Sequence, residues 1–222
     1  MNDVSARSYH WLFWCLALAG FCLDQASKYE VFRRLRPIAE PDPHYPSQLV
    51  GEVELISGIF KLHTAYHRDQ LETGTGIPAA LRSFSSDELP HVNQGALFGR
   101  GHTIFGMNGN IVFAVVSVGA ALAIIYWSRR PHSRHDRFLS LSLGLILAGT
   151  LGNLYDRIVF HGVRDFLYWY YLIDWPIFNI ADCCLVIGAS LLLLQAFFTQ
   201  PHPAPVETFA ETKESAVVAE VK

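Results

Sequence analysis

Four long apolar stretches alternate with polar segments along the chain. Residues 8–23 contain no Asp, Glu, Lys or Arg, and residues 101–128 carry no formal charge. Two further stretches cover residues 138–155 and 175–198. Because a hydrocarbon core of ~30 Å needs about 20 apolar residues in helical form, each stretch predicts a membrane-spanning helix. The first helix is a full span only if it continues through polar positions to about Leu35.

The long polar stretch, residues 37–102, predicts a small antiparallel sheet. Four prolines exclude a helix at its start: Pro37, Pro41, Pro43 and Pro46. Residues 53–67 are rich in β-branched and aromatic side chains, with Gly58 as the expected turn. Residues 68–92 predict an inserted surface loop, with a helical turn near residues 79–83. The expected fold is an all-α membrane protein with four transmembrane helices and a small extracytoplasmic sheet.

Composition supports a membrane protein with a single domain. The 222 residues are 51% hydrophobic and only 17% charged, whereas soluble domains carry about 25% charged residues. The domain is expected to cover residues 1–200. Residues 201–222 are rich in Pro, Ala and Glu without periodicity, which predicts a disordered cytoplasmic tail. The net charge of −3 predicts no nucleic-acid partner, since such proteins present a basic face.

The distribution of arginine predicts the topology. Residues 129–137 (RRPHSRHDR) form the most basic short loop, and such loops remain in the cytoplasm. Both termini are then cytoplasmic, and residues 37–102 and 157–175 lie outside. Three arginines near the outer end of the first helix go against this trend and are expected to pair with acids or reach headgroups: Arg33, Arg34 and Arg36.

This topology brings acids and amides to one level near the outer face. They are Asp24 and Lys28 on the first helix, Asn93 before the second, Asn153 and Asp156 at the end of the third, Asp165 in the connecting segment, and Asn179 and Asp182 near the start of the fourth. Asp182 is expected about seven residues into its helix, which is roughly 10 Å. Asp24 and Lys28 are four residues apart, so they share a helix face and can pair.

Two interpretations of this polar level remain open on spacing alone. Two close carboxylates share one proton, so the pair can act as general base and general acid of an aspartyl mechanism. Asn153 and Asn179 would then orient the carboxylates or bind developing negative charge. Alternatively, the same residues form a polar network that holds four helices together.

Four motifs in order resemble those of the lipoprotein signal peptidases, also called signal peptidase II, which are bacterial membrane aspartyl proteases. DQASK at residues 24–28 is similar to DQxTK, and NQGALFG at 93–99 to NxGaaFG. GNLYDR at 152–157 with VRDF at 163–166 is similar to GNxxDR…VVDF, and FNIAD at 178–182 to FNxAD.

The resemblance implies four transmembrane helices, an extracytoplasmic β-cradle and a short periplasmic helix. It implies Asp165 and Asp182 as the catalytic dyad, with Asp156 as a rival to Asp165. Residues implied as lining or supporting the substrate site are Asn93, Asn153, Asp156, Arg157, Asn179, Asp24 and Lys28. The implied reaction removes the signal peptide from diacylglyceryl-modified prolipoproteins, N-terminal to the lipidated cysteine. The implied location is the bacterial inner membrane with its lipids, and no metal or cofactor is implied.

Two departures from the family pattern stand out. Arg164 replaces the usual Val beside Asp165, and an adjacent cation is expected to lower the pKa of that carboxyl. Residues 68–92 are an insertion between the sheet and the NQGALFG motif, with no role readable from the sequence.

Metal-site patterns are weak in this chain. His63 and His67 are spaced like ligands on a helix but fall in a predicted strand, where they are less suitably placed to share a metal ion. The four cysteines show no CxxC spacing and predict neither a disulfide nor a zinc site.

Two functions from other classes compete with the peptidase. A small transporter or proton channel would need polar residues continuing toward the cytoplasmic ends of the helices, where residues 111–127 and 185–194 offer almost none. A non-catalytic scaffold related to the peptidase would not need to keep Asp165 and Asp182.

Overall fold

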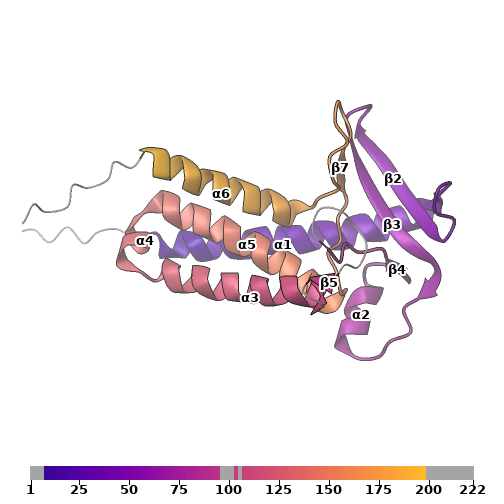
Figure 1. Ribbon diagram of the computed structural model, residues 1–222, viewed down its shortest axis with the longest axis horizontal. Coiled ribbons are helices and arrows are strands. Elements are labelled where there is room, and N and C mark those ends of the chain that lie inside the picture. The colour runs from indigo at the N-terminus through magenta and orange to yellow at the C-terminus, as the bar shows by residue number, and fades with distance from the viewer. Residues whose placement is uncertain (1–7, 96–102, 105–106, 199–222) are drawn as a thin grey trace, which may run out of the picture.

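Four long helices run side by side, and a small sheet lies at one end of them (Figure 1). The computed structural model describes residues 8–95, 103–104 and 107–198. The long helices are α1 (His10–Leu35), α3 (Gly109–Ser128), α5 (Arg137–Val159) and α6 (Ile180–Phe198). The short helix α4 (Pro131–His135) joins α3 to α5 at the end away from the sheet. The tail predicted to be disordered lies outside the described residues.

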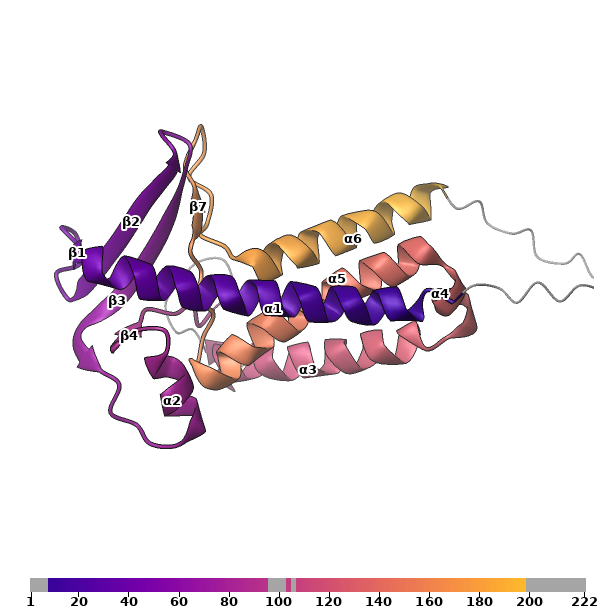
Figure 2. The ribbon, with the colours of Figure 1, turned by 180° about the vertical axis from the view of Figure 1, so that it is seen from behind.

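Three helices among the described residues are long and apolar enough to cross a membrane: α3, α5 and α6. Helix α1 is more polar because Asp24, Gln25 and Lys28 interrupt it, and it continues past the other helices into the sheet region (Figure 2).

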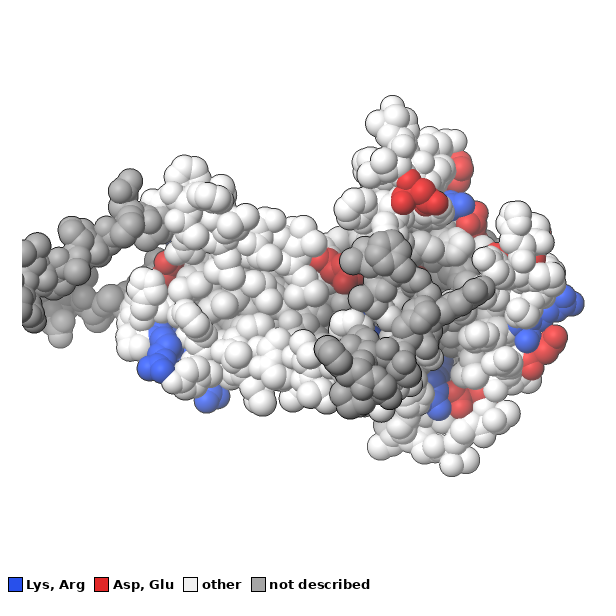
Figure 3. All heavy atoms as spheres, viewed as in Figure 1, with Lys and Arg blue, Asp and Glu red and all other residues white. Residues whose placement is uncertain are grey.

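The outward face of α3 is apolar along its length. Ile111, Val115, Val118 and Leu122 are all exposed at helical spacing. On the face seen in Figure 3, the surface over the helices is almost uncharged, and most charged groups lie toward its two ends. A continuous apolar surface of this kind fits a lipid environment.

Two helices begin later than predicted. The second apolar stretch was expected to be helical from residue 101, but strands β5 (Thr103–Ile104) and β6 (Met107–Asn108) pair there as a hairpin. The Asn108 side chain then accepts a hydrogen bond from the backbone N–H of Asn110 at 2.9 Å and caps α3.

Helix α6 begins at Ile180 rather than at residue 175. Phe178 is held in an extended bridge with Leu167, each backbone N–H donating to the other's carbonyl at 3.0 and 2.8 Å. The predicted depth of Asp182 was therefore wrong, because this residue lies in the first turn of α6.

The sheet is antiparallel with the order β1–β2–β3–β4, and β7 pairs with the start of β3. Its strands are β1 (Glu40–Pro41), β2 (Gln48–Ile56), β3 (Phe60–Leu71), β4 (Glu88–Pro90) and β7 (Leu167–Trp169). Gly58 turns the chain between β2 and β3 with φ of 74°, a value that favours glycine. The predicted small sheet and its turn are confirmed.

The insertion is more ordered than the predicted surface loop. Strand β3 continues into it as far as Leu71, α2 (Ile77–Ser83) follows, and β4 returns to the sheet. The Arg82 guanidinium donates to the carbonyl of Val159 at 2.7 Å, so the insertion is attached to the end of α5.

Two apolar clusters connect these elements. Between the helices, Phe13 and Leu147 are fully buried in one cluster. Between α1 and the sheet, the rings of Phe32 and Tyr66 meet at 5.7 Å, and the Tyr66 hydroxyl donates to the Phe32 carbonyl at 2.5 Å. The sheet is therefore packed against the C-terminal end of α1.

Close packing of α5 on α6 depends on Gly149. A Cβ at this position would lie 2.3 Å from the backbone oxygen of Ala181, nearer than atoms can approach. The start of α6, which carries Asp182, is thereby held against α5.

Replacing Gly149 with Ala is expected to destabilise the protein by about 1–3 kcal/mol, because backbone atoms must move. Thermal unfolding in detergent measures this as a lower midpoint. Gly119→Ala is the matched control, since nothing lies within 4 Å of a Cβ there. Equal midpoints for the two variants would contradict the close contact between α5 and α6.

Candidate active site

Asp182 forms a capping box with Asn179 at the start of α6. The Asn179 side-chain oxygen accepts from the Asp182 backbone N–H, and an Asp182 carboxylate oxygen accepts from the Asn179 backbone N–H, both at 3.1 Å. This reciprocal pairing satisfies two backbone N–H groups of the first turn. The helix N-terminus also favours a carboxylate. The Asp182 side chain is therefore fixed by the helix it begins.

Asp165 lies between α5 and β7 on a segment held at both sides. On one side, Val163 and Asn93 exchange backbone hydrogen bonds at 2.8 and 2.9 Å. On the other side, Leu167 pairs with Phe178. Two extended contacts thus bring Asp165 close to the start of α6.

Amide groups connect the two carboxylates. Asp165 accepts from the side chains of Asn179 at 2.6 Å and Asn93 at 3.1 Å. Asp182 accepts from the Asn153 side chain at 2.8 Å. Asn179 therefore contacts both acids, with its side chain on Asp165 and its backbone N–H on Asp182.

Burial raises the pKa of Asp165 to about 7, and the nearby negative charge of Asp182 acts in the same direction. The hydrogen bonds from Asn93 and Asn179 oppose this shift without cancelling it. The protonated form of Asp165 is therefore favoured as pH falls below about 7.

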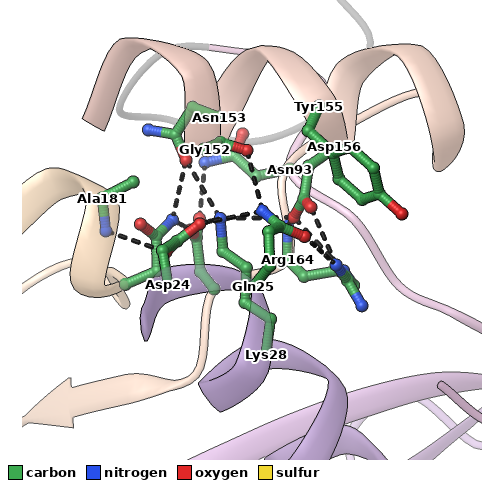
Figure 4. Close-up of polar contacts among 12 residues, drawn as sticks. Asp24, Gln25, Lys28, Asn93, Gly152, Asn153, Tyr155, Asp156, Arg164 and Ala181 are labelled. Atoms are coloured by element: carbon green, nitrogen blue, oxygen red, sulfur yellow. Dashed lines mark hydrogen bonds and ion pairs between the residues drawn. The ribbon is translucent and has the colours of Figure 1, made fainter. Parts of the chain in front are cut away.

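Two acids and two bases form a fully buried cluster of ion pairs (Figure 4). Lys28 lies 2.9 Å from Asp24 and 3.4 Å from Asp156. Arg164 approaches Asp156 at 2.9 Å and also donates to it through Nε at 3.2 Å. Buried charges of this kind are tolerated because each one is paired.

The cluster is bonded to the residues that hold the two carboxylates. Lys28 donates to the side-chain oxygen of Asn153 at 3.2 Å. Asp24 accepts from the backbone N–H of Ala181 at 2.8 Å. These bonds from α1 to α5 and to the first turn of α6 fix the position of that turn relative to the two helices.

Comparison with known proteins identifies the family. The family model for signal peptidase (SPase) II matches residues 87–198. A lipoprotein signal peptidase of Rhodopirellula baltica is 35% identical over 205 residues, covering 86% of this chain and 74% of that protein. The chain belongs to the signal peptidase II family. It is a membrane protease of the aspartic type, and the family removes signal peptides from prolipoproteins.

A second relative agrees with this assignment, and a solved structure has a similar fold. A lipoprotein signal peptidase of Symbiobacterium thermophilum is 32% identical, covering 81% of this chain and 90% of that protein. The fold is similar to a bacterial membrane enzyme solved by the in meso method at 1.9 Å resolution, with a TM-score of 0.62. That match has 20% identity and covers 89% of this chain and 100% of the other.

The signal peptidase II motifs have physical explanations here. The asparagine and aspartate of FNIAD are the two partners of the capping box. The DQASK motif supplies Asp24, Gln25 and Lys28, which share the buried cluster. Of NQGALFG, residues 96–99 lie outside the described part of the chain.

The expected effect of Arg164 on Asp165 was wrong. The Arg164 side chain turns away from the dyad toward Asp156 and Gln25, and burial dominates the pKa of Asp165. Asp156 is fully buried, and its two oxygens accept from Arg164.

Arg157 faces α3 rather than bonding to either carboxylate. It approaches the side chain of Asn110 at 3.4 Å, and its guanidinium lies 4.9 Å from the centre of the Phe113 ring. Asn110 in turn donates to the Arg157 carbonyl at 3.1 Å.

Three residues of this region were not singled out from the sequence: Gln25, Ser85 and Asn110. Gln25 lies inside a motif and next to Asp24, so its position was a usable signal. Ser85 and Asn110 lie in segments whose contacts only the fold reveals.

The two histidines considered as ligands have other contacts. His63 lies 2.7 Å from a Glu52 carboxylate oxygen. The His67 ring lies beside the His91 ring at a tilt of 46°, with ring centres 5.3 Å apart. Within the described ranges, no three His, Cys, Asp or Glu side chains are grouped to hold a metal.

Lys28→Met is expected to cost about 3–5 kcal/mol, because it leaves Asp24 and Asp156 with too little positive charge in a buried site. Thermal unfolding in detergent measures the loss. Arg33→Met on the same helix is the control, since Arg33 is exposed and its pairing with Glu30 contributes little. A Lys28→Met midpoint equal to that of the control would contradict the role of the cluster.

Proposed function

We propose that Asp165 and Asp182 are the catalytic dyad of this signal peptidase. The observation that carries this proposal is the contact of Asn179 with both carboxylates. Asp165 and Asp182 are partly exposed, whereas the rival Asp156 is fully buried and occupied by Arg164 and Lys28. A substrate and a water molecule need a carboxylate they can reach, which favours Asp165 over Asp156.

The proposed reaction begins with Asp165 protonated and Asp182 ionised. Water attacks the scissile carbonyl carbon, Asp182 takes a proton from the water, and Asp165 donates its proton to the carbonyl oxygen. In the resulting diol, Asp182 returns its proton to the leaving nitrogen while a diol hydroxyl reprotonates Asp165. The C–N bond breaks, and the dyad recovers its single proton.

The neighbouring amides hold the dyad and line the substrate site. Asn93 and Asn153 each donate to one carboxylate, so each orients an acid for proton transfer. Asp24 and Lys28 support them from α1, and Arg157 supports the site from the end of α5.

We propose that the substrate is a prolipoprotein carrying a diacylglyceryl-cysteine, cleaved N-terminal to that cysteine. The apolar faces of the helices support this assignment, because they allow a lipidated peptide to reach the dyad from the surrounding lipid. The four helices and the sheet act as one peptidase domain of residues 1–200.

The proposed topology has four spans in the bacterial inner membrane, with α1 as the fourth, and the dyad near the outer face. The basic loop around α4 lies at the opposite end from the sheet, as the positive-inside rule requires of a cytoplasmic loop. Arg33 and Arg34 pair with Glu30, and Arg36 pairs with Glu88, so these arginines are compensated on the outer side. Both termini are then cytoplasmic.

Asp165→Asn and Asp182→Asn are each expected to reduce cleavage by at least about 10²–10⁴-fold, because each removes a proton-transfer group. Purified protein in detergent, a diacylglyceryl-modified prolipoprotein and a gel shift measure the rate, with EDTA in a parallel sample.

Asp174→Asn is the matched control, since Asp174 is exposed and accepts a hydrogen bond from the Tyr168 hydroxyl at 2.6 Å, away from Asp165 and Asp182. This control should cleave at the wild-type rate. If Asp165→Asn keeps full activity and Asp156→Asn loses it, then Asp156 and not Asp165 is the catalytic partner of Asp182.

The rate should also fall at alkaline pH. The raised pKa of Asp165 means that this group loses its proton as pH rises through about 7. Cleavage needs that proton, so kcat/KM should decline by about tenfold per pH unit above this point. A profile measured from acidic to alkaline pH that stays flat on its alkaline side would contradict the assignment of Asp165 as the general acid.

A further inference from the structure

Arg164 is fully buried and makes contacts in several directions. Its guanidinium donates to Asp156, to Gln25 at 3.0 Å and to the Ser85 hydroxyl at 3.3 Å. Its Cζ lies 4.3 Å from the centre of the Tyr29 ring. A planar guanidinium suits this site because it can bond in its plane and stack across its face.

The backbone of Arg164 is held by the same acid as its side chain. The Arg164 N–H donates to Asp156 Oδ2 at 2.9 Å. The preceding residue, Val163, is held by Asn93. Two successive residues before Asp165 are thus fixed, one to α5 and one to the segment that ends the insertion.

The charge of the buried cluster is balanced only with Arg164 present. Asp24 and Asp156 contribute two negative charges, and Lys28 contributes one positive charge. The guanidinium supplies the fourth charge, so the cluster is neutral. An apolar residue at position 164 would leave one net negative charge among these buried groups, and Arg157 is a further cation that interacts electrostatically with Asp156.

The inserted segment reaches this cluster through Ser85. Ser85 is fully buried and lies between α2 and β4. The two departures from the family pattern, Arg164 and the insertion, therefore meet in one hydrogen bond.

We propose that Arg164 is a positioning residue for Asp165 and that the inserted segment, through Ser85, holds Arg164 in place. This inference rests on the proposed role of Asp165 in catalysis. The insertion then has a definite task, which is to fix one wall of the active site from outside the helices.

Arg164→Met tests the proposal, because methionine keeps an unbranched apolar side chain but lacks the guanidinium with its N–H donors and its positive charge. We expect kcat to fall by about 10–100-fold with KM changed less than about twofold, as a small displacement of a catalytic group produces. The alkaline limb of the pH profile should move to lower pH, because a displaced Asp165 is better solvated and farther from Asp182. Loss of positive charge without displacement would move the limb to higher pH and overturn the proposal.

Ser85→Ala tests the contribution of the insertion and still serves if Arg164→Met does not fold. We expect kcat to fall by about three- to tenfold, the effect of one hydrogen bond to a charged group. The double variant should be no slower than Arg164→Met alone, since both changes disrupt the same contact. Effects that multiply, or a wild-type kcat for Ser85→Ala, would overturn the role of the insertion.

Arg164→Lys and Arg36→Met complete the comparison. Lysine keeps the charge but not the fork, so Arg164→Lys should retain a kcat defect and overturns the proposal if it matches wild type. Arg36→Met breaks another ion pair to the insertion, at Glu88, without touching the dyad segment. Arg36→Met should leave kcat and the pH profile unchanged. A defect like that of Arg164→Met would overturn the specific role of the Ser85 contact, because loosening the insertion elsewhere would have the same effect.

Asp165→Asn is measured on the same substrate preparation. Activity in that variant would remove the proposed dyad itself. If Asp165→Asn is inactive and Arg164→Met has the wild-type kcat, the proposed dyad stands and the positioning role of Arg164 is rejected.

Discussion

Four paired charges on α1, on α5 and on the segment that follows α5 are the constraint on which the arrangement of the candidate site depends. Separating a buried charge from its partners carries a large desolvation penalty. The ion pairs among Asp24, Lys28, Asp156 and Arg164 therefore fix α1, α5 and the segment after α5 relative to one another. Hydrogen bonds from Lys28 to Asn153 and from the Ala181 N–H to Asp24 connect this cluster to the residues that hold Asp165 and Asp182. The cluster thereby joins the helices to the candidate site.

The capping box explains why an acid can be placed so accurately at the start of a membrane helix. The first turn of any helix has backbone N–H groups that need acceptors, and in a lipid environment this need is acute. Asp182 and Asn179 satisfy two of them. Because Asn179 has its side-chain amide left for Asp165, one residue both caps the helix and joins the two acids.

Much of this arrangement follows from sequence, and the misses have physical causes. Apolar length predicted the helices, and alternation around Gly58 predicted the sheet. The start of α6 was misjudged because apolar residues such as Phe178 belong equally well to a strand bridge, which only tertiary pairing decides. The predicted effect of Arg164 on the pKa of Asp165 was wrong because neighbouring residues in the chain can direct their side chains differently. The Arg164 side chain bonds to Asp156 and not to Asp165.

The proposed sharing of one proton between Asp165 and Asp182 can be tested without substrate by infrared titration of carboxyl groups. Wild type should show a protonated carboxyl band that disappears as pH rises through about 7, the raised pKa of Asp165. The same band should be missing in Asp165→Asn and retained in Asp174→Asn. A wild-type protein with no carboxyl group titrating near neutral pH, or a band that survives in Asp165→Asn, would contradict the central claim that Asp165 is the protonated partner of Asp182.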